Sequence, residues 1–123
     1  MQRRKSILAT FSILGLCLLL SDCADDSRTT TLNLDGNDVR TAVLQTEQKL
    51  FHLTLQINGQ LTGKGKLGIG YTDSTTYKEY IITGGNVQIQ YDGDWYSPIC
   101  YVTYRPLTPT KGSLTVKADF GGD

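Results

Sequence analysis

The sequence has little of what catalysis and metal binding require. Of its 123 residues, one is a histidine and three are cysteines. A catalytic site needs several reactive groups held together, and a structural zinc site needs four Cys or His ligands. His52 lies on the polar face of an alternating segment, which indicates a surface residue. Asp92-Gly93-Asp94 lacks the further oxygen ligands of a calcium loop and is typical of a hairpin turn. We therefore expect no enzyme activity, no metal site and no cofactor.

The chain also lacks an excess of positive charge. Beyond residue 23 it has nine lysines and arginines against eleven aspartates and glutamates, a net charge of −2. Proteins that bind nucleic acid neutralise phosphates with clustered basic residues. The charges here are interspersed, so we expect no nucleic-acid partner.

No apolar run is long enough to cross a membrane as a helix, which takes about 20 residues. The longest covers residues 7–20 and follows a basic start formed by Arg3, Arg4 and Lys5. A basic start, a short apolar run and a polar exit are typical of a secretory signal peptide. We assign residues 1–22 to this signal.

The end of the signal, Leu20-Ser21-Asp22-Cys23, resembles the lipobox of bacterial lipoproteins. Leu20 and Ser21 match the family pattern, whereas Asp22 departs from it. The resemblance implies that Cys23 carries acyl chains such as palmitate, becomes the first mature residue and anchors the protein to a membrane. The alternative is an ordinary cleaved signal with Cys23 incidental.

Residues 23–28 form a short tether in this interpretation. Asp25 and Asp26 resemble the export signal of surface-exposed lipoproteins in some Gram-negative bacteria. The resemblance implies a place in the bacterial cell envelope, at the outer membrane or cell surface rather than the inner membrane. A solvated tether without a sorting role is the competing interpretation.

Residues 29–123 are typical of one all-β domain. Apolar and polar residues alternate in several short segments, and alternation with period two predicts strands with one buried face. The clearest are residues 51–57 and 113–120, whereas residues 39–45 fit a helical turn or a strand equally. Turn residues recur about every 8–12 positions. The pattern predicts a small antiparallel β-sandwich or barrel of about six to eight strands.

Asn58-Gly59 predicts a hairpin between residues 51–57 and 60–71. A two-residue loop would place Leu61 on the wrong face. A three-residue loop with Gly59 in the left-handed region pairs Leu55 with Leu61 and keeps the apolar faces together. Gly84-Gly85-Asn86 predicts a second turn.

Gly63 and Gly65 fall on the core face of the following segment. Glycine weakens a strand, so its presence needs a reason. We expect either large side chains from another strand over the glycines or a sharp bend of the sheet. Lys64 and Lys66 on the opposite face discourage edge-to-edge pairing.

Aromatic residues are concentrated in one region. All seven tyrosines and the single tryptophan lie between residues 71 and 104. Trp95 and Tyr96 interrupt the strand alternation between a turn and Pro98. Tyr and Trp favour binding surfaces, so Trp95 and Tyr96 are the candidate binding residues and Trp95 is expected to be partly exposed. Full burial of Trp95 is the observation that would refute this patch.

Cys100 is the remaining cysteine and lies in a strand pattern, which favours a small buried residue. The sequence as a whole favours a lipid-anchored β-domain that binds or inhibits a partner without catalysis, the partner being a protein or a glycan. The alternative is a structural or accessory subunit of an envelope or surface assembly.

Overall fold

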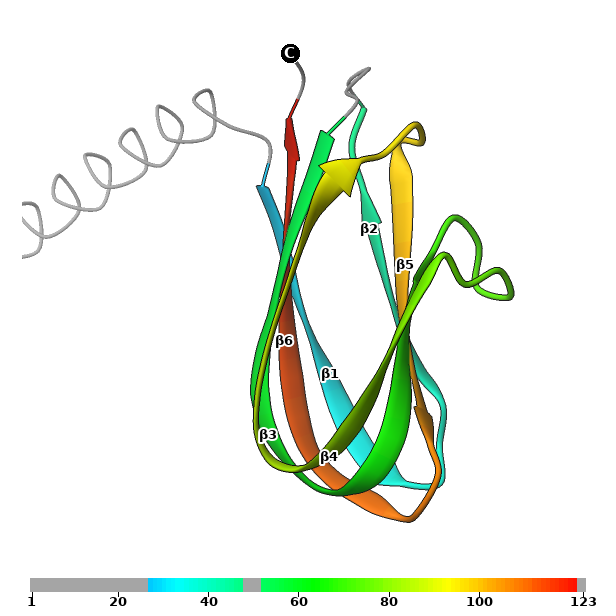
Figure 1. Ribbon diagram of the computed structural model, residues 1–123, viewed down its shortest axis with the longest axis vertical. Coiled ribbons are helices and arrows are strands. Elements are labelled where there is room, and N and C mark those ends of the chain that lie inside the picture. The colour runs from blue at the N-terminus through cyan, green and yellow to red at the C-terminus, as the bar shows by residue number, and fades with distance from the viewer. Residues whose placement is uncertain (1–26, 48–51, 122–123) are drawn as a thin grey trace, which may run out of the picture.

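A computed structural model describes residues 27–47 and 52–121 (Figure 1). In these residues the chain forms six antiparallel strands, which confirms the all-β prediction. The strands are β1 (Ser27–Gly36), β2 (Arg40–Gln45), β3 (His52–Gly70), β4 (Lys78–Asp94), β5 (Ile99–Pro106) and β6 (Thr110–Gly121). The ambiguous segment after residue 38 is therefore a strand, and residues 27 and 28 of the expected tether belong to the sheet.

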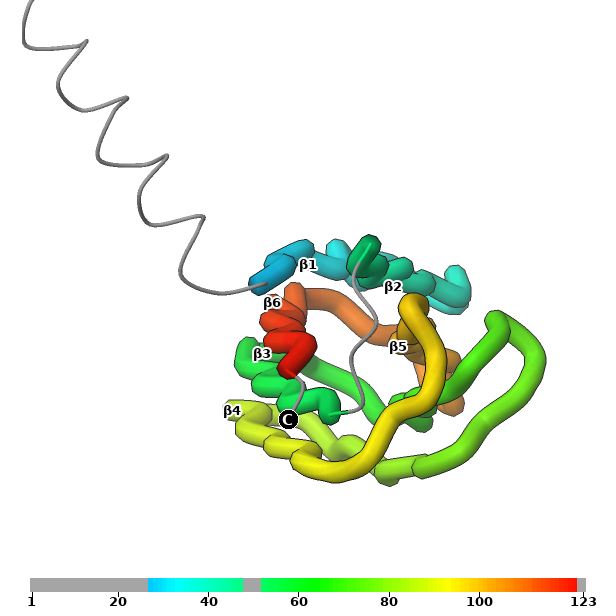
Figure 2. Tube along the Cα trace, turned by 90° about the horizontal axis from the view of Figure 1, so that it is seen from above, coloured from blue at the N-terminus to red at the C-terminus, as the bar shows by residue number. Residues whose placement is uncertain are grey.

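The strands form one sheet that folds over on itself into a nearly closed barrel (Figures 1 and 2). Residues 52–62 of β3 pair with β6, whereas residues 65–70 pair with β5. The long half-sheet contains β1, β6, the first part of β3 and residues 85–94 of β4. The short half-sheet contains β2, β5, the last part of β3 and residues 78–83 of β4. β3 and β4 therefore belong to both halves.

The bend between the halves lies at glycines. The β3–β4 register shifts between Leu61 and Lys64, and Gly63 between them has a φ of 96°. Gly85 on β4 has a φ of 114° opposite Leu61. Positive φ is open to glycine at little cost and strained for other residues. The sharp bend expected near Gly63 and Gly65 is thus confirmed.

The predicted hairpin at Asn58-Gly59 is wrong. β3 runs straight through these residues, and Gly59 pairs with Val87 on one side and Leu114 on the other. Its φ is not in the left-handed region. A Cβ on Gly59 would overlap the carbonyl of Ser113 and lie 2.9 Å from Cα of Leu114. Glycine is needed here because β3 and β6 approach closely. The predicted turn at residues 84–86 is likewise part of continuous β4.

The core lies between the half-sheets and is built from alternate residues of every strand. Leu53, Leu55 and Ile57 of β3 are fully buried, as the alternation predicted. Tyr104 of β5 is also fully buried, and its ring lies where a Cβ of Gly65 would be. Its hydroxyl is 3.0 Å from Oγ1 of Thr110. A large side chain therefore covers Gly65, as expected.

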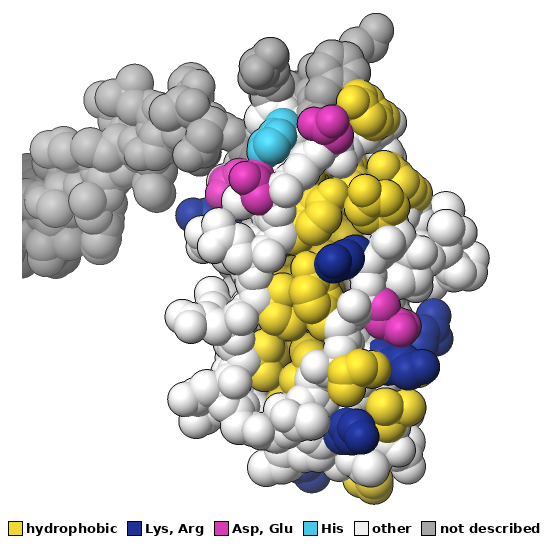
Figure 3. Space-filling model, viewed as in Figure 1, with side chains coloured by type: hydrophobic (Ala, Val, Ile, Leu, Met, Phe, Trp, Pro, Cys, Tyr) yellow, Lys and Arg dark blue, Asp and Glu magenta, His cyan; other side chains and the backbone are white. Residues whose placement is uncertain are grey.

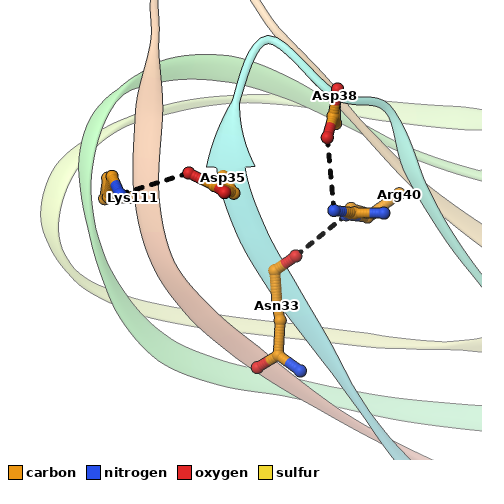
Figure 4. A network of polar contacts seen from close by, with 5 residues as sticks. All are labelled: Asn33, Asp35, Asp38, Arg40 and Lys111. Atoms are coloured by element: carbon orange, nitrogen blue, oxygen red, sulfur yellow. Dashed lines mark hydrogen bonds and ion pairs between the residues drawn. The ribbon is translucent and has the colours of Figure 1, made fainter.

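The barrel has two seams, and β1 and β2 close one of them without pairing their backbones. Nε of Arg40 on β2 donates to the carbonyl of Asn33 on β1 at 3.0 Å, and its Nη2 lies 3.3 Å from the Asp38 carboxylate (Figure 4). Arg28 of β1 donates to the carbonyl of Gln45 at 3.0 Å. Lys111 of β6 pairs with Asp35 at 3.2 Å beside the same turn (Figure 4).

The other seam lies between the two arms of β4, residues 78–83 and 85–94. Figure 2 shows these arms on the side of the barrel opposite β1 and β2. Within residues 27–47 and 52–121, β4 pairs only with β3, so its outer edge has no strand beside it. We name this side the β4 seam, and it faces the viewer in Figure 1.

Candidate binding surface

Trp95 lies at one end of the β4 seam and is buried, with 1% of its surface exposed. The prediction of a partly exposed Trp95 is therefore wrong, and the patch centred on it fails. The reason is the path of the chain: the segment after β4 crosses from the long to the short half-sheet (Figure 2). Trp95 fills the space between the halves at this crossing. Its Nε1 donates to the carbonyl of Ile99 at 2.9 Å, which satisfies the buried donor.

Trp95 is the buried centre of an aromatic cluster that also contains Tyr71, Tyr77 and Tyr91. Tyr71 stacks on Trp95 with a centroid distance of 4.2 Å. Tyr77 and Tyr91 meet Trp95 edge to face at 5.9 Å and 6.1 Å. Such pairs contribute about 0.5–1.5 kcal/mol each beyond area burial. The cluster joins the β3–β4 loop to the end of β4, which keeps its rings in place.

The outer members of the cluster reach solvent. Tyr77 is 58% exposed, while Tyr71 and Tyr91 are half-buried. Burial, followed by the nearby Tyr77 phenol, raises the pKa of Tyr91 to about 12. The Tyr91 phenol therefore stays neutral at physiological pH. The cluster thus presents a rigid, uncharged aromatic surface of the kind that forms binding hot spots.

Tyr96, the second candidate residue, is 69% exposed beside this cluster. Its hydroxyl donates to Oδ2 of Asp94 at 3.3 Å. The Asp94 carboxylate raises the pKa of Tyr96. Tyr96 is thus available at the surface, although Trp95 is not.

An apolar stripe follows the β4 seam below the cluster (Figure 3). Tyr80, Ile89 and Tyr91 of β4 pack against the core while remaining partly exposed. Ile81, on the outer side of the same strand, is 56% exposed. Residues 80–91 contain no Asp, Glu, Lys or Arg. Nζ of Lys78 lies 5.7 Å from the centre of the Tyr80 ring, so the stripe is bordered by charge at this end of β4. The seam therefore combines an unpaired strand edge with side chains that are largely apolar and carry no charge between residues 80 and 91.

His52 and Cys100 do not form a reactive pair, because one lies on the outer face of the sheet and the other in the core. His52 lies on the outer face of the long half-sheet, where Nε2 is hydrogen bonded to the carboxylate of Asp92. Oγ1 of Thr54 donates to the same carboxylate at 3.0 Å, and these two hydrogen bonds lower the pKa of Asp92. Cys100 is fully buried, and burial raises the pKa of its thiol to about 12. A thiol of this kind is inert.

Cys23, the expected lipidation site, lies outside the described residues. Residues 27–47 and 52–121 hold no group of three His, Cys, Asp or Glu side chains suited to a metal ion. In the same residues there is no helix long and apolar enough to cross a membrane.

Sequence reasoning missed Tyr71, Tyr77 and Tyr91 as members of one site. The available signal is the concentration of tyrosines after residue 70, which does not show which rings meet in the fold. It also missed the β4 edge, because Gly84-Gly85 suggested a turn and divided the strand in two. The long uncharged edge becomes visible only when β4 is continuous.

Comparison with known proteins supports the fold. No protein-family model and no curated protein sequence matches the chain. Among solved structures, it is similar to PliG of Aeromonas hydrophila, a periplasmic inhibitor of g-type lysozyme. The identity is 10%, the TM-score is 0.51, and the match covers 78% of this chain and 88% of that one.

A Bacillus endospore appendage protein, from a family of disulfide-linked pili, matches with 10% identity and a TM-score of 0.49 over 81% of this chain and 88% of that one. A mutant of the carbohydrate-binding module CBM29-2 matches with 13% identity and a TM-score of 0.45 over 76% and 71%. At such identities a match reflects the fold and leaves the ligand open. The chain therefore has the all-β architecture that it shares with PliG.

Proposed function

We propose that this protein is a lipid-anchored domain of the bacterial cell envelope that binds a protein partner at the β4 seam without catalysis. The observation that carries the proposal is the unpaired outer edge of β4 along the uncharged residues 80–91. Proteins usually protect long edge strands with charges, proline or a covering element. Charges lie at the two ends of β4, at Lys78, Glu79, Asp92 and Asp94, and the stretch between them has none and is suited to a partner strand.

Strand addition explains why backbone and side chains would act together at the seam. A partner strand hydrogen bonds to the free N–H and C=O groups of the edge, and its side chains enter neighbouring pockets. The apolar stripe and the exposed face of Tyr77 lie along this edge. Burying them on binding adds the hydrophobic contribution that backbone hydrogen bonds lack.

The anchor at Cys23 places the domain close to the membrane in this proposal. Only residues 24–26 separate Cys23 from the start of β1 at Ser27. Four residue steps reach about 14 Å at most. The partner is therefore an envelope component at the same membrane surface, the outer membrane or cell surface being favoured by Asp25 and Asp26.

Mass spectrometry of the mature protein tests the anchor. A diacyl or triacyl group on Cys23 is expected, since more than one chain is needed for stable anchoring. Cys23→Ser should release the protein from the membrane fraction. An unmodified mature terminus at any other residue would refute lipidation while leaving the binding proposal open to its own test.

Co-purification with matched lysine substitutions tests the binding surface. Ile81→Lys puts a charge on the β4 edge strand, whereas Val43→Lys puts one on β2; the two side chains are 56% and 52% exposed. A partner recovered with the Val43→Lys protein but lost with Ile81→Lys supports the seam. Equal recovery with both variants contradicts it.

The accessory-subunit alternative uses the same edge and differs in its consequence. An accessory subunit is needed for its assembly to form, so deletion of this chain leaves partner subunits unassembled. A binding or inhibitor domain leaves the partner intact and changes only its activity or access. Native gels of the partner from a deletion strain separate these outcomes.

A further inference from the structure

The outer face of the long half-sheet carries an unusual set of side chains. Cross-strand neighbours form rows on this face, one of which contains Thr31, Thr115, Asn58 and Gln88. The row on one side contains Thr29, Lys117, Gln56 and Gln90, and the row on the other contains Asn33, Ser113, Gln60 and Asn86. Lys117 is the only charged residue in the three rows. We name these rows the amide face.

The lack of charge distinguishes this face from the rest of the surface. Exposed positions are normally rich in Lys, Glu, Arg and Asp. The outer face of the short half-sheet follows that rule, because Lys64, Lys66, Arg105 and Glu79 lie on it. The low number of charges on the amide face, where Lys117 is the single one, is therefore a local property of these three rows.

The amides keep their hydrogen-bonding groups free. Gln56, Asn58, Gln60, Asn86, Gln88 and Gln90 are all exposed. Within the part of the chain that the structure describes, none of these side chains hydrogen bonds to another group. Each amide offers two N–H donors and one carbonyl acceptor. The face therefore presents donors and acceptors side by side.

The surface is hollowed along the two strands that carry the amides. One hollow of about 410 Å³ is lined by Gln56, Asn58, Gln88, Ile89 and Gln90. A second of about 390 Å³ lies beside Asn58, Gly59, Asn86, Val87 and Gln88. Four strands about 4.8 Å apart and three rows about 7 Å apart give a field of roughly 14 by 14 Å. This area matches a few linked sugar rings.

We propose that the amide face binds a neutral glycan. Sugar hydroxyls donate and accept hydrogen bonds, as the amides and threonines do. Within the three rows only Lys117 could pair with a phosphate or a uronic acid, and Asp92, Asp119 and Lys111 lie in the rows beyond them. Strand addition would use the backbone edge of β4, whereas a glycan would use the exposed amide side chains on the outer face of β3 and β4. The face is separate from the aromatic cluster, although Asn86, Gln88 and Gln90 lie on the strand whose edge carries the protein-binding proposal.

Nuclear magnetic resonance titration of the mature chain with neutral hexasaccharides tests this proposal. Maltohexaose, cellohexaose and xylohexaose are the probes, and an alginate hexasaccharide is the charged comparison. At least one neutral probe should shift the side-chain amide signals of Asn58 and Gln88. Alginate should shift them less. If no neutral probe shifts these signals, or if the shifts fall on the aromatic cluster instead, the proposal is overturned.

A matched pair of charge substitutions completes the test. Gln88→Glu changes one amide of the face to a carboxylate of the same size. Gln45→Glu makes the same change at an exposed position on β2, away from the face. Gln88→Glu should weaken binding of the neutral probe at least about tenfold, because an amide donor is lost and a charge must be desolvated. Gln45→Glu should leave binding within about twofold. Equal affinities of the two variants would contradict the proposed site, provided that both melt at the temperature of the parent protein.

Discussion

The phenol ring of Tyr104 occupies the space that a side chain on Gly65 would need, and the two residues lie on neighbouring strands of the short half-sheet. Gly65→Ala should therefore destabilise the domain by about 1–3 kcal/mol, the usual cost of overpacking. Urea unfolding measures the effect. Gly121→Ala is the control, because no atom lies within 4 Å of a Cβ added there. Equal unfolding midpoints for the two variants would mean that Tyr104 does not hold this position.

Substitutions of Gly59 test whether β3 runs straight past β6 at this residue. A Cβ at this position would overlap the carbonyl of Ser113, and the φ of Gly59 is not left-handed. Gly59→Ala and Gly59→Asn should both lower the free energy of unfolding by about 1 kcal/mol or more. Asparagine tolerates left-handed backbone better than other residues. A Gly59→Asn protein markedly more stable than Gly59→Ala would favour the hairpin turn over the close approach of β3 and β6.

Trp95 and Tyr96 should respond in opposite ways to substitution. Trp95→Ala removes the buried centre of the aromatic cluster. It should lower the free energy of unfolding by about 3–5 kcal/mol, as large aromatic deletions in cores do. Tyr96→Ala removes an exposed side chain and should change stability by less than about 0.5 kcal/mol. Thermal unfolding of both variants checks the difference. A Trp95→Ala protein as stable as Tyr96→Ala would contradict the burial of Trp95.

Asp92 links stability to acid pH. Its pKa is lowered first by the hydrogen bond with His52 and then by that with Thr54. A carboxyl with a lowered pKa stabilises the fold above its unfolded pKa of about 3.9, and this contribution is lost as the pH falls through the lower folded value. His52→Ala should raise the pKa of Asp92 and shift acid unfolding to higher pH.

Carbon-13 NMR titration of the Asp92 carboxyl measures this change. Thr54→Val is the matched comparison and should raise the pKa of Asp92 by less than His52→Ala does. An Asp92 that titrates at the same pH with and without His52 would show that the hydrogen bond is not maintained in solution.

The fold class and the faces of most strands were predictable from period two alone. Leu53, Leu55 and Ile57 alternate with polar residues and are buried as expected. The strand connections were not predictable in the same way. Asn58-Gly59 and Gly84-Gly85 have strong local turn signals, yet both lie inside long strands. Pairing of β3 with β6, more than fifty positions later in the chain, outweighs the signal at Asn58-Gly59, and pairing of β4 with β3 outweighs the one at Gly84-Gly85.

The candidate site was predictable only in part, for a related reason. The density of tyrosines indicated the right region, but the choice of Trp95 depended on treating its loop as a free surface. That loop connects the two half-sheets, so its largest side chain fills the space between them. Local alternation cannot show that a loop closes a barrel.

Site-specific photo-crosslinking in intact cells tests whether a partner binds at the β4 seam. The photoreactive residue p-benzoyl-phenylalanine would replace Tyr77 or Ile81 at the β4 seam, or Val43 on β2 as the control. All three positions are about half exposed, at 58%, 56% and 52%. We expect one discrete adduct from Tyr77 and Ile81 and none from Val43. No adduct from the seam positions, or the same adduct from Val43, would contradict binding at the β4 seam.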